Sequence, residues 1–338
     1  MSQFIQLHTL VSYPPSNLNR DDLGRPKTAI MGGVQRLRVS SQSLKRAWRT
    51  STLFADLIGV RTKQLGVEVE KALKAKGISD KNARDWAAQI AAVYGAVKKD
   101  KAPEIEQLVH ISSAERATLD ALVETLAAEK RAPETPELDA LLHEQHAVDI
   151  AMFGRMLASK TQHNVEAAVQ VAHALGVHAS VVEDDFFTAV DDLNQDDSGA
   201  AHLGETGFAA AVFYQYVCID RSLLKHNLGG DEALTQRAIQ ALIETALTVP
   251  PNGKQNSFAS RAYAHYALLE RGDRQPRSLS LAFLQPVAKD YTTGAVQALE
   301  QLHTNMDAVY GPCAEAHAKL NVLSGEGSLA DLLAFAAE

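Results

Sequence analysis

The chain has 338 residues, of which 46% are hydrophobic and 22% are charged, as is typical of a globular protein with a substantial core. Its two cysteines, Cys218 and Cys313, lie far apart and form neither a disulfide framework nor a metal-binding pattern, which suits a reducing compartment. No apolar run is long enough to span a bilayer, and residues 1–4 do not resemble the start of a signal peptide. We therefore expect a cytoplasmic protein with no membrane partner, built as one domain with large insertions or as two domains.

The net charge of -8 conceals a strong local asymmetry. Residues 20–49 contain eight Lys or Arg against two Asp, whereas residues 183–197 contain seven acidic residues and no Lys or Arg. The acidic average by itself argues weakly against nucleic-acid binding. The asymmetry instead predicts a local anion-binding site and is compatible with a head-to-tail contact between copies of the chain.

The N-terminal part predicts two strands joined by a long loop. Residues 3–13 alternate in a way typical of a strand, and Pro14-Pro15 is expected to end it. Residues 34–39 form a second expected strand, in which Arg36 and Arg38 share one face.

A helix with two distinct faces is expected next. Ser40 and Ser41 are typical of a helix start, because a serine oxygen can accept the free N–H groups of the first turn. The periodicity predicts a helix over residues 42–58. Its apolar stripe consists of Leu44, Ala47, Trp48, Ser51 and Ala55. Its polar and basic stripe consists of Gln42, Lys45, Arg46 and Arg49.

Residues 60–147 are rich in alanine and predict a mostly helical insertion, interrupted by a linker at 133–136. One apolar face of this insertion is expected to contain Trp86, Ile90, Val93, Tyr94 and Val97. Residues 149–156 then predict a strand, and residues 164–175 predict a helix rich in alanine and valine.

The second half of the chain adds a hairpin and further helices. The acidic segment 183–197, the small polar residues 199–207 and a strand over 208–219 predict a protruding hairpin-like element. A helix ending near residue 247, short strands within 257–284 and a helix over 293–309 follow. The order of elements predicts an α+β sheet domain that carries insertions.

The strongest chemical signal is the basic corner at residues 19–49. The two strand arginines, the serine helix start and the basic stripe together offer cations and N–H groups to a row of phosphates. The preceding loop adds further polar and basic side chains, namely Asn19, Arg20, Arg25 and Lys27. The alternative is a basic helix face that simply contacts water.

The segment Arg36–Ala47, preceded by Leu18–Asp22, resembles the CasC-type backbone (crRNA-binding) subunit of the type I-E CRISPR Cascade complex. Further matching segments follow in the same order, namely Asp149–Ala151 with Gly154–Met156, Phe187–Leu193, His202–Gly204, Phe213–Tyr214 with Tyr216, Asn227–Gly230 and Gly253–Gln255. The resemblance covers most of the chain outside residues 60–147 and the part after about residue 285.

The resemblance implies an α+β fold with three parts. These are an RRM-like (ferredoxin-like) palm of residues 1–59, 148–185 and 208–338, a helical fingers insertion of residues 60–147, and a thumb hairpin of residues 186–207. It implies a scaffold that is not an enzyme and needs no cofactor. Copies of such a subunit assemble head to tail as a helical filament along crRNA, with other Cascade subunits, and present the guide for pairing with target DNA in antiviral defence.

The resemblance also implies which residues bind RNA. The residues expected on the crRNA backbone are Asn19, Arg20, Lys27, Ser40, Gln42, Lys45, Arg46 and Arg49. Met156 is expected to wedge against bases, or alternatively to be a core methionine at a strand end. Phe187, Thr188 and His202 are expected to contact RNA from the thumb.

Target DNA contact in the fingers is a weaker expectation. It falls on Lys98, Lys99 and Lys101, for which a solvated charge cluster is the alternative.

Two other functions compete with the scaffold. Acidic residues of the thumb, above all Asp191 and Asp192, could hold a divalent metal for a ribonuclease, although no nucleophile and base accompany them. His143 and His146 lie within a fragment that falls short of the zinc-protease pattern, and we expect a polar helix face and no metal site there. A structural oligomer made of protein alone would leave the basic corner unexplained.

Overall fold

The computed structural model describes residues 3–98, 103–143, 146–157, 160–189 and 202–338. The chain forms two compact units. Unit 1 comprises Met1–Phe54, Gln170–Asp220 and Ile239–Glu338, and unit 2 comprises Ala55–Val169 and Arg221–Ala238. No helix among the described residues is both long enough and apolar enough to cross a bilayer.

Unit 1 is built on a sheet whose neighbouring strands are antiparallel. Its strand order is β11 (Ala316–Asn321), β10 (Ala264–Gly272), β1 (Phe4–Ser16), β9 (His202–Asp220), β7 (Ala174–Gly176), β3 (Val34–Val39) and β2 (Thr28–Met31). Two further strands, β6 (Val169–Val171) and β8 (Glu183–Ala189), pair with β9. Together with the helices this sheet confirms the predicted α+β class.

Helices cover both faces of the β1 and β10 part of the sheet. The helix α10 (Tyr291–Tyr310) packs Val296 and Leu299 against a core that includes Leu10 and Leu268. The opposite face of β10 carries Arg271, which donates to a backbone carbonyl of α11 (Leu329–Ala337). Burial on both faces explains why polar as well as apolar side chains of β1 are inside. The remaining elements of this part are α8 (Glu232–Thr248), α9 (Gln255–Phe258) and η3 (Ser280–Phe283).

The first strand is longer than its sequence suggests. β1 continues through Pro14-Pro15 to Ser16, so the prediction that the prolines end it is wrong. Pairing of β1 with β10 has already finished at Val11, and its register against β9 shifts between Tyr13 and Ser16. The missing proline N–H groups therefore cost no ladder hydrogen bonds, because neither β10 nor β9 pairs with Pro14 or Pro15.

The helix after β3 is shorter than predicted. α1 spans Ser41–Arg49 and is followed by the 3-10 turn η1 (Thr52–Phe54) instead of continuing to residue 58. The Thr50 hydroxyl donates to the Arg46 carbonyl at 2.8 Å where α1 ends. Leu44, Ala47 and Trp48 are buried as expected, whereas Ala55 is exposed and does not belong to the apolar stripe.

Unit 2 is mostly helical. Its helices are α2 (Leu65–Ala75), α3 (Asp80–Tyr94), α4 (Ser113–Glu129), α5 (Thr135–Asp139), α6 (Val148–Phe153), α7 (Arg221–Asn227) and the first turns of α8. A small sheet pairs β4 (Val60–Thr62) with β5 (Val109–Ile111). Trp86, Ile90, Val93 and Tyr94 of the predicted apolar face are buried in one core cluster, which confirms them, and Val97, beyond the end of α3, is partly buried against that cluster.

Two predictions between residues 149 and 175 are wrong. Residues 148–153 form α6 and not a strand, and within α6 the buried Asp149 carboxylate accepts the Gly59 N–H at 2.9 Å and contacts the His110 ring at 2.8 Å. Residues 161–176 form the short turn η2 (Thr161–His163) followed by β6 and β7, and not a helix. The partner strand β9 is distant in sequence, and hydrogen bonds between β7 and β9 outweigh the helix propensity of this alanine-rich segment.

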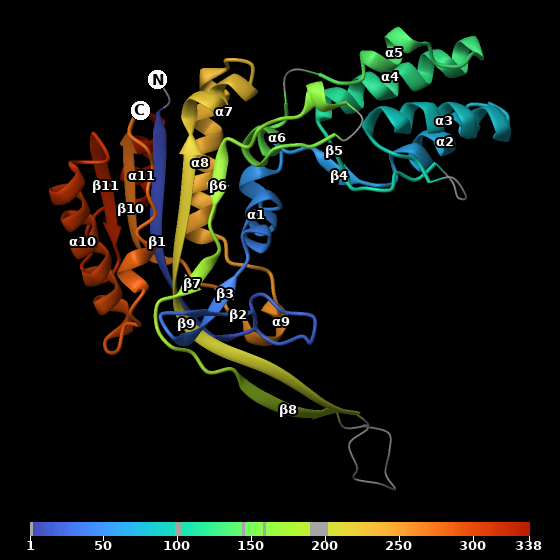
Figure 1. Cartoon of the computed structure of the whole chain (residues 1–338). Coiled ribbons are helices and arrows are strands. Elements are labelled where there is room, and N and C mark those ends of the chain that lie inside the picture. The colour runs from blue at the N-terminus through green and yellow to red at the C-terminus, as the bar shows by residue number, and fades with distance from the viewer. Residues whose placement is uncertain (1–2, 99–102, 144–145, 158–159, 190–201) are drawn as a thin grey trace, which may run out of the picture. The chain divides into compact units, whose positions relative to one another are not determined.

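The expected hairpin is present in the described residues. β8 pairs with β9 from Glu183 opposite Phe208 to Ala189 opposite His202, and β9 begins earlier than predicted. Because the β1 ladder on β9 ends at Ala209, residues 202–208 of β9 pair with β8 and extend away from the rest of the sheet (Figure 1). Residues 190–201, which include Asp191 and Asp192, lie outside the described residues.

Candidate nucleic-acid-binding surface

The start of α1 is fixed by two side chains. The Ser40 Oγ accepts the Ser43 N–H at 3.3 Å, so Ser40 caps the helix as predicted. The Ser40 N–H in turn donates to the Asn19 Oδ1 at 2.9 Å. Asn19 and Ser40 were both expected on the RNA backbone, and the structure brings them together in one brace that holds the loop against the helix start.

The basic stripe of α1 lies on the face opposite the core. Gln42 and Arg46 are exposed, and Lys45 and Arg49 are half-buried. On the other side Trp48 is fully buried. The predicted division of α1 into an apolar and a basic face is therefore confirmed, and the basic face can reach phosphates over two turns.

The loop before β2 is held in shape by its own side chains. The Asp21 carboxylate accepts the backbone N–H groups of Leu23 and Arg25 at 3.0 and 2.9 Å. The Lys27 N–H donates to the Asn19 carbonyl, and Lys27 accepts the Arg38 N–H through its own carbonyl. Lys27 is therefore placed beside β3, while Arg20, whose backbone bridges to Pro26, remains exposed.

Arg36 does not contribute to the positive surface, which corrects the sequence interpretation. Its side chain is fully buried and donates to the carbonyls of Gly176 at 3.0 Å and Phe283 at 3.1 Å. Arg38, two residues along the same strand, remains partly exposed. The difference arises because η3 covers the strand at Arg36, a tertiary contact that alternation in a strand cannot reveal.

His173 is a surface residue that the sequence analysis missed. Its Nδ1 lies 2.8 Å from Arg38 Nη1, and because arginine can only donate, Nδ1 accepts and Nε2 carries the proton. Partial burial and the positive charges of Arg38 and Lys27 lower the pKa of the His173 imidazole. A neutral ring with an exposed N–H donor therefore extends this surface. The wrong helix prediction over residues 164–175 concealed it, because His173 lies between β6 and β7.

The hairpin presents aromatic side chains to solvent. Phe187 pairs with Gly204, and a Cβ added to Gly204 would lie 2.3 Å from the Phe187 Cζ, so the ring lies over the glycine. Phe187 nevertheless remains 44% exposed, and Thr188 is exposed. The backbone of His202 belongs to β9, and its side chain lies outside the described residues.

The expected base-contacting methionine is exposed. Met156 in unit 2 is 86% exposed, so the alternative of a core methionine is wrong. Lys98 forms an ion pair with Glu104 at 2.9 Å. Lys99 and Lys101, the other two expected DNA contacts, lie outside the described residues.

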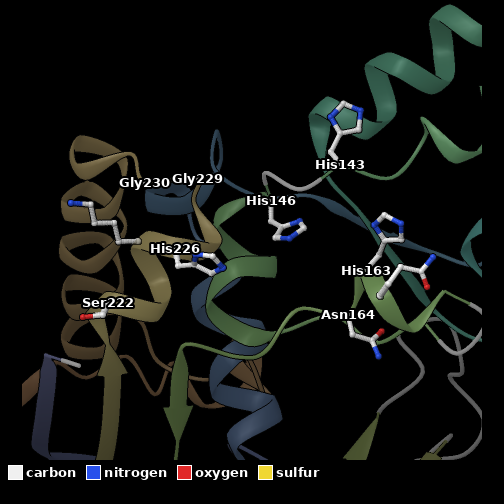
Figure 2. A pocket seen from close by; sticks show the side chains of 10 residues that line it. His143, His146, His163, Asn164, Ser222, His226, Gly229 and Gly230 are labelled. Atoms are coloured by element: carbon white, nitrogen blue, oxygen red, sulfur yellow. The ribbon is translucent and has the colours of Figure 1, made fainter. Parts of the chain in front are cut away.

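A pocket of about 900 Å³ in unit 2 is lined by four histidines (Figure 2), namely His143, His146, His163 and His226. His143 and His146 lie outside any helix, so the expected polar helix face is wrong. Within the described residues no group of His, Cys, Asp and Glu could hold a metal ion. The His143 ring contacts the Thr118 hydroxyl at 2.9 Å, and burial lowers the pKa of His146 to about 4. His146 is therefore a neutral polar group near pH 7.

One family model and several solved structures match this chain. The sequence matches the family described as CT1975-like protein over residues 5–332. The chain belongs to this family. Among solved structures, a chain of a "CRISPR RNA-guided surveillance complex, pre-nicking" is 30% identical, with a TM-score of 0.85 and 99% of each chain covered. A chain of a "CRISPR RNA-guided surveillance complex" is 25% identical, with a TM-score of 0.75 and the same coverage. No curated protein matched the chain.

Membership of the CT1975-like family extends across both units. The matched region includes the sheet, α1, the hairpin and the helices of unit 2. The family assignment therefore applies to the whole chain and not to one grafted domain.

Proposed function

We propose that this chain is a non-catalytic crRNA-binding scaffold of a type I-E CRISPR surveillance (Cascade) complex. The observation that carries the proposal is the partly exposed basic face of α1, next to the loop that Asn19 ties to Ser40, in a chain that matches surveillance-complex chains over 99% of its length. Lys45, Arg46 and Arg49 are spaced to neutralise successive phosphates, and each neutralised phosphate adds salt-dependent affinity. Such contacts position RNA without reading its sequence.

The distribution of charge supports a head-to-tail array along crRNA. The basic corner at residues 20–49 and the acidic segment at residues 183–197 are both in unit 1. One copy can therefore offer its acidic hairpin to the basic surface of the next copy. In this arrangement, in the cytoplasm and with other Cascade subunits, the bound guide pairs with target DNA and base pairing supplies the sequence specificity.

At the hairpin base, Asp184 is paired with Arg25 at 2.9 Å and so helps to place the hairpin. The alternative, a metal-dependent ribonuclease, would rely on Asp191 and Asp192, and its test is given below.

The decisive experiment reverses the basic face of α1. In the triple variant K45E/R46E/R49E we expect RNA retained on purification with a co-expressed CRISPR transcript to fall by at least about 100-fold. The salt slope of RNA binding should fall by about 3, one for each lost phosphate contact. Circular dichroism should be unchanged, because the stripe lies opposite the buried Trp48.

The matched control reverses three exposed lysines of unit 2, K71E/K81E/K130E, which carry the same change in net charge. This control should retain RNA at close to the wild-type level. If both triple variants lose RNA equally, net charge and not the α1 face controls binding. If neither loses RNA, the proposed surface is wrong.

A further inference from the structure

The point at which the hairpin leaves the sheet of unit 1 lies next to Asn17. β1 ends at Ser16, whose partner on β9 is Ala209. Gly207, two residues further along β9 towards the hairpin tip, pairs with β8 and no longer with β1. Contacts at Gly207 therefore help to fix the direction of the hairpin relative to the sheet.

Asn17 is fully buried and joins the hairpin to the loop before β2. Its Nδ2 donates to the Gly24 carbonyl in the loop and to the Gly207 carbonyl in the hairpin, both at 2.9 Å. Each carbonyl needs one proton, and among uncharged side chains only asparagine and glutamine carry two N–H groups on one nitrogen. A single carboxamide thus bridges two segments that are distant in sequence.

Two close approaches surround this bridge. A Cβ added to Gly207 would lie 3.1 Å from the Pro26 Cδ, so the hairpin base packs directly on the loop. A Cβ added to Gly253 would lie 2.1 Å from the Leu18 carbonyl oxygen, so the turn before α9 packs against the residue that follows Asn17. The loop, the hairpin base and this turn therefore meet at the end of β1.

Charged side chains at the same junction hold the hairpin less firmly than Asn17 does. They line a pocket of about 660 Å³ and have both signs, namely Arg20, Arg25 and Lys254 against Asp184 and Glu205. The ion pair of Arg25 with Asp184 joins side chains that are 43% and 42% exposed. An exposed ion pair contributes little, whereas loss of a donor to buried carbonyls leaves them unsatisfied. The hydrogen bonds of Asn17 are therefore the stronger link between loop and hairpin.

We propose that Asn17 is a positioning residue that fixes the hairpin relative to the basic corner before RNA binds. The proposal rests on the proposed function and deepens it. Because Asn17 is buried, it acts through the hairpin and does not contact RNA itself. A hairpin that is already held in one direction has less freedom to lose on binding, so Asn17 raises the affinity for RNA without adding a phosphate contact.

The first test is hydrogen exchange in the RNA-free full chain. Leucine is branched at the same carbon as asparagine but has no donor, so N17L removes both hydrogen bonds and keeps the approximate shape. We expect backbone amides of residues 205–210 to exchange at least about 10-fold faster in N17L, while residues 80–94 of unit 2 exchange as in wild type. G207A, which presses on Pro26 without removing a donor, should change residues 205–210 in the same direction by a smaller factor.

The matched control is a second buried asparagine of the same kind. In unit 2, the Asn227 Nδ2 donates to the carbonyls of Ala151 at 3.0 Å and Glu166 at 2.9 Å. N227L therefore removes the same two hydrogen bonds from a different part of the chain. It should leave the exchange of residues 205–210 at the wild-type rate.

The second test measures binding of labelled single-stranded RNA at several salt concentrations. We expect N17L to bind about 10-fold more weakly than wild type, because the hairpin must be ordered on binding. The slope of log affinity against log salt should stay at the wild-type value, because no phosphate contact is lost. An effect on affinity without an effect on slope distinguishes positioning from direct contact.

Each other result overturns a stated part of the proposal. If N17L and N227L accelerate exchange of residues 205–210 equally, the cause is a general loss of stability. If N17L loosens the hairpin and keeps the wild-type affinity, the hairpin position does not serve RNA binding. If the salt slope falls, Asn17 places cations of the loop and not the hairpin. If wild type binds no RNA, the proposed function fails, while the exchange comparison still decides whether Asn17 holds the hairpin.

Discussion

At the scale of single residues, Arg36 and Arg38 show how one tertiary contact separates two similar side chains. Both lie on the same face of β3, and only Arg36 is buried, where it satisfies the carbonyls of Gly176 and Phe283. A buried carbonyl without a donor costs about 1–3 kcal/mol. Arg36 therefore contributes to the stability of unit 1, whereas Arg38 contributes to its positive surface.

This contrast gives a prediction. We expect R36M to lower the free energy of unfolding by about 3 kcal/mol, because at least two buried carbonyls lose their donor. R38M should change the stability by less than about 0.5 kcal/mol and should instead weaken RNA binding. Urea unfolding followed by circular dichroism, together with RNA binding, measures both effects. Equal losses of stability in the two variants would contradict this assignment.

At the scale of elements, a buried carboxylate ties β1, β10 and α10 together. Glu270 of β10 accepts from Arg277 at 2.8 Å and lies 3.1 Å from the His8 ring of β1 and 3.0 Å from the His303 ring of α10. Burial would raise the pKa of Glu270, but hydrogen bonds from His303, His8 and Arg277 outweigh it and hold the pKa well below the usual range. Charge on Glu270 therefore stabilises the packing of α10 on the sheet.

The sign of the pH dependence follows from this depressed pKa. The unfolded chain protonates Glu270 near pH 4.5 and the folded chain does so only at much lower pH, so its contribution is present above about pH 4.5 and is lost as pH falls below it. We expect E270Q to be less stable than wild type by about 3 kcal/mol at pH 7, because Arg277 loses its buried partner. Urea unfolding at about pH 7 and about pH 3 should show that the difference in free energy of unfolding between wild type and E270Q is smaller at the lower pH. If this difference is the same at both pH values, Glu270 stabilises the fold through its packing and not through its charge.

At the scale of the whole molecule, the acidic hairpin distinguishes a scaffold from a nuclease. Asp191 and Asp192 lie outside the described residues, so the distinction depends on activity. We expect wild type and D191N/D192N to leave bound RNA at full length with magnesium or manganese present, because a scaffold has no cleavage step. Denaturing gels of RNA recovered from both proteins measure this. Metal-dependent shortening by wild type that disappears in the variant would establish the ribonuclease instead.

The sequence predicted correctly those features that depend on local chemistry. The serine cap of α1 and the opposed Trp48 and Arg46 faces follow from helical periodicity and from hydrogen bonding within one turn. The presence of a hairpin after residue 183 follows from turn-rich residues between two extended segments, although β9 begins earlier than the sequence predicts.

The wrong predictions fall where contacts with segments distant in sequence determine the secondary structure. Residues 148–153 form a helix in which Asp149 contacts Gly59 and His110, both distant in sequence. The segment around His173 is extended because β7 pairs with β3 and β9. Pairing of two distant strands costs loop-closure entropy before hydrogen bonds form, and the pattern within one segment does not indicate which strand will pair with it.

The sequence by itself determined the α+β class, the basic face of α1 and the opposite charges of corner and hairpin, because composition and periodicity encode these directly. Only the tertiary structure decided that Arg36 is internal and that His173 and Met156 face solvent. It alone placed Lys254 in a pocket with Arg20, because Asn17 and Gly253 hold together segments that are distant in sequence. Such positions depend on which surfaces cover each other, and burial is a property of the folded chain.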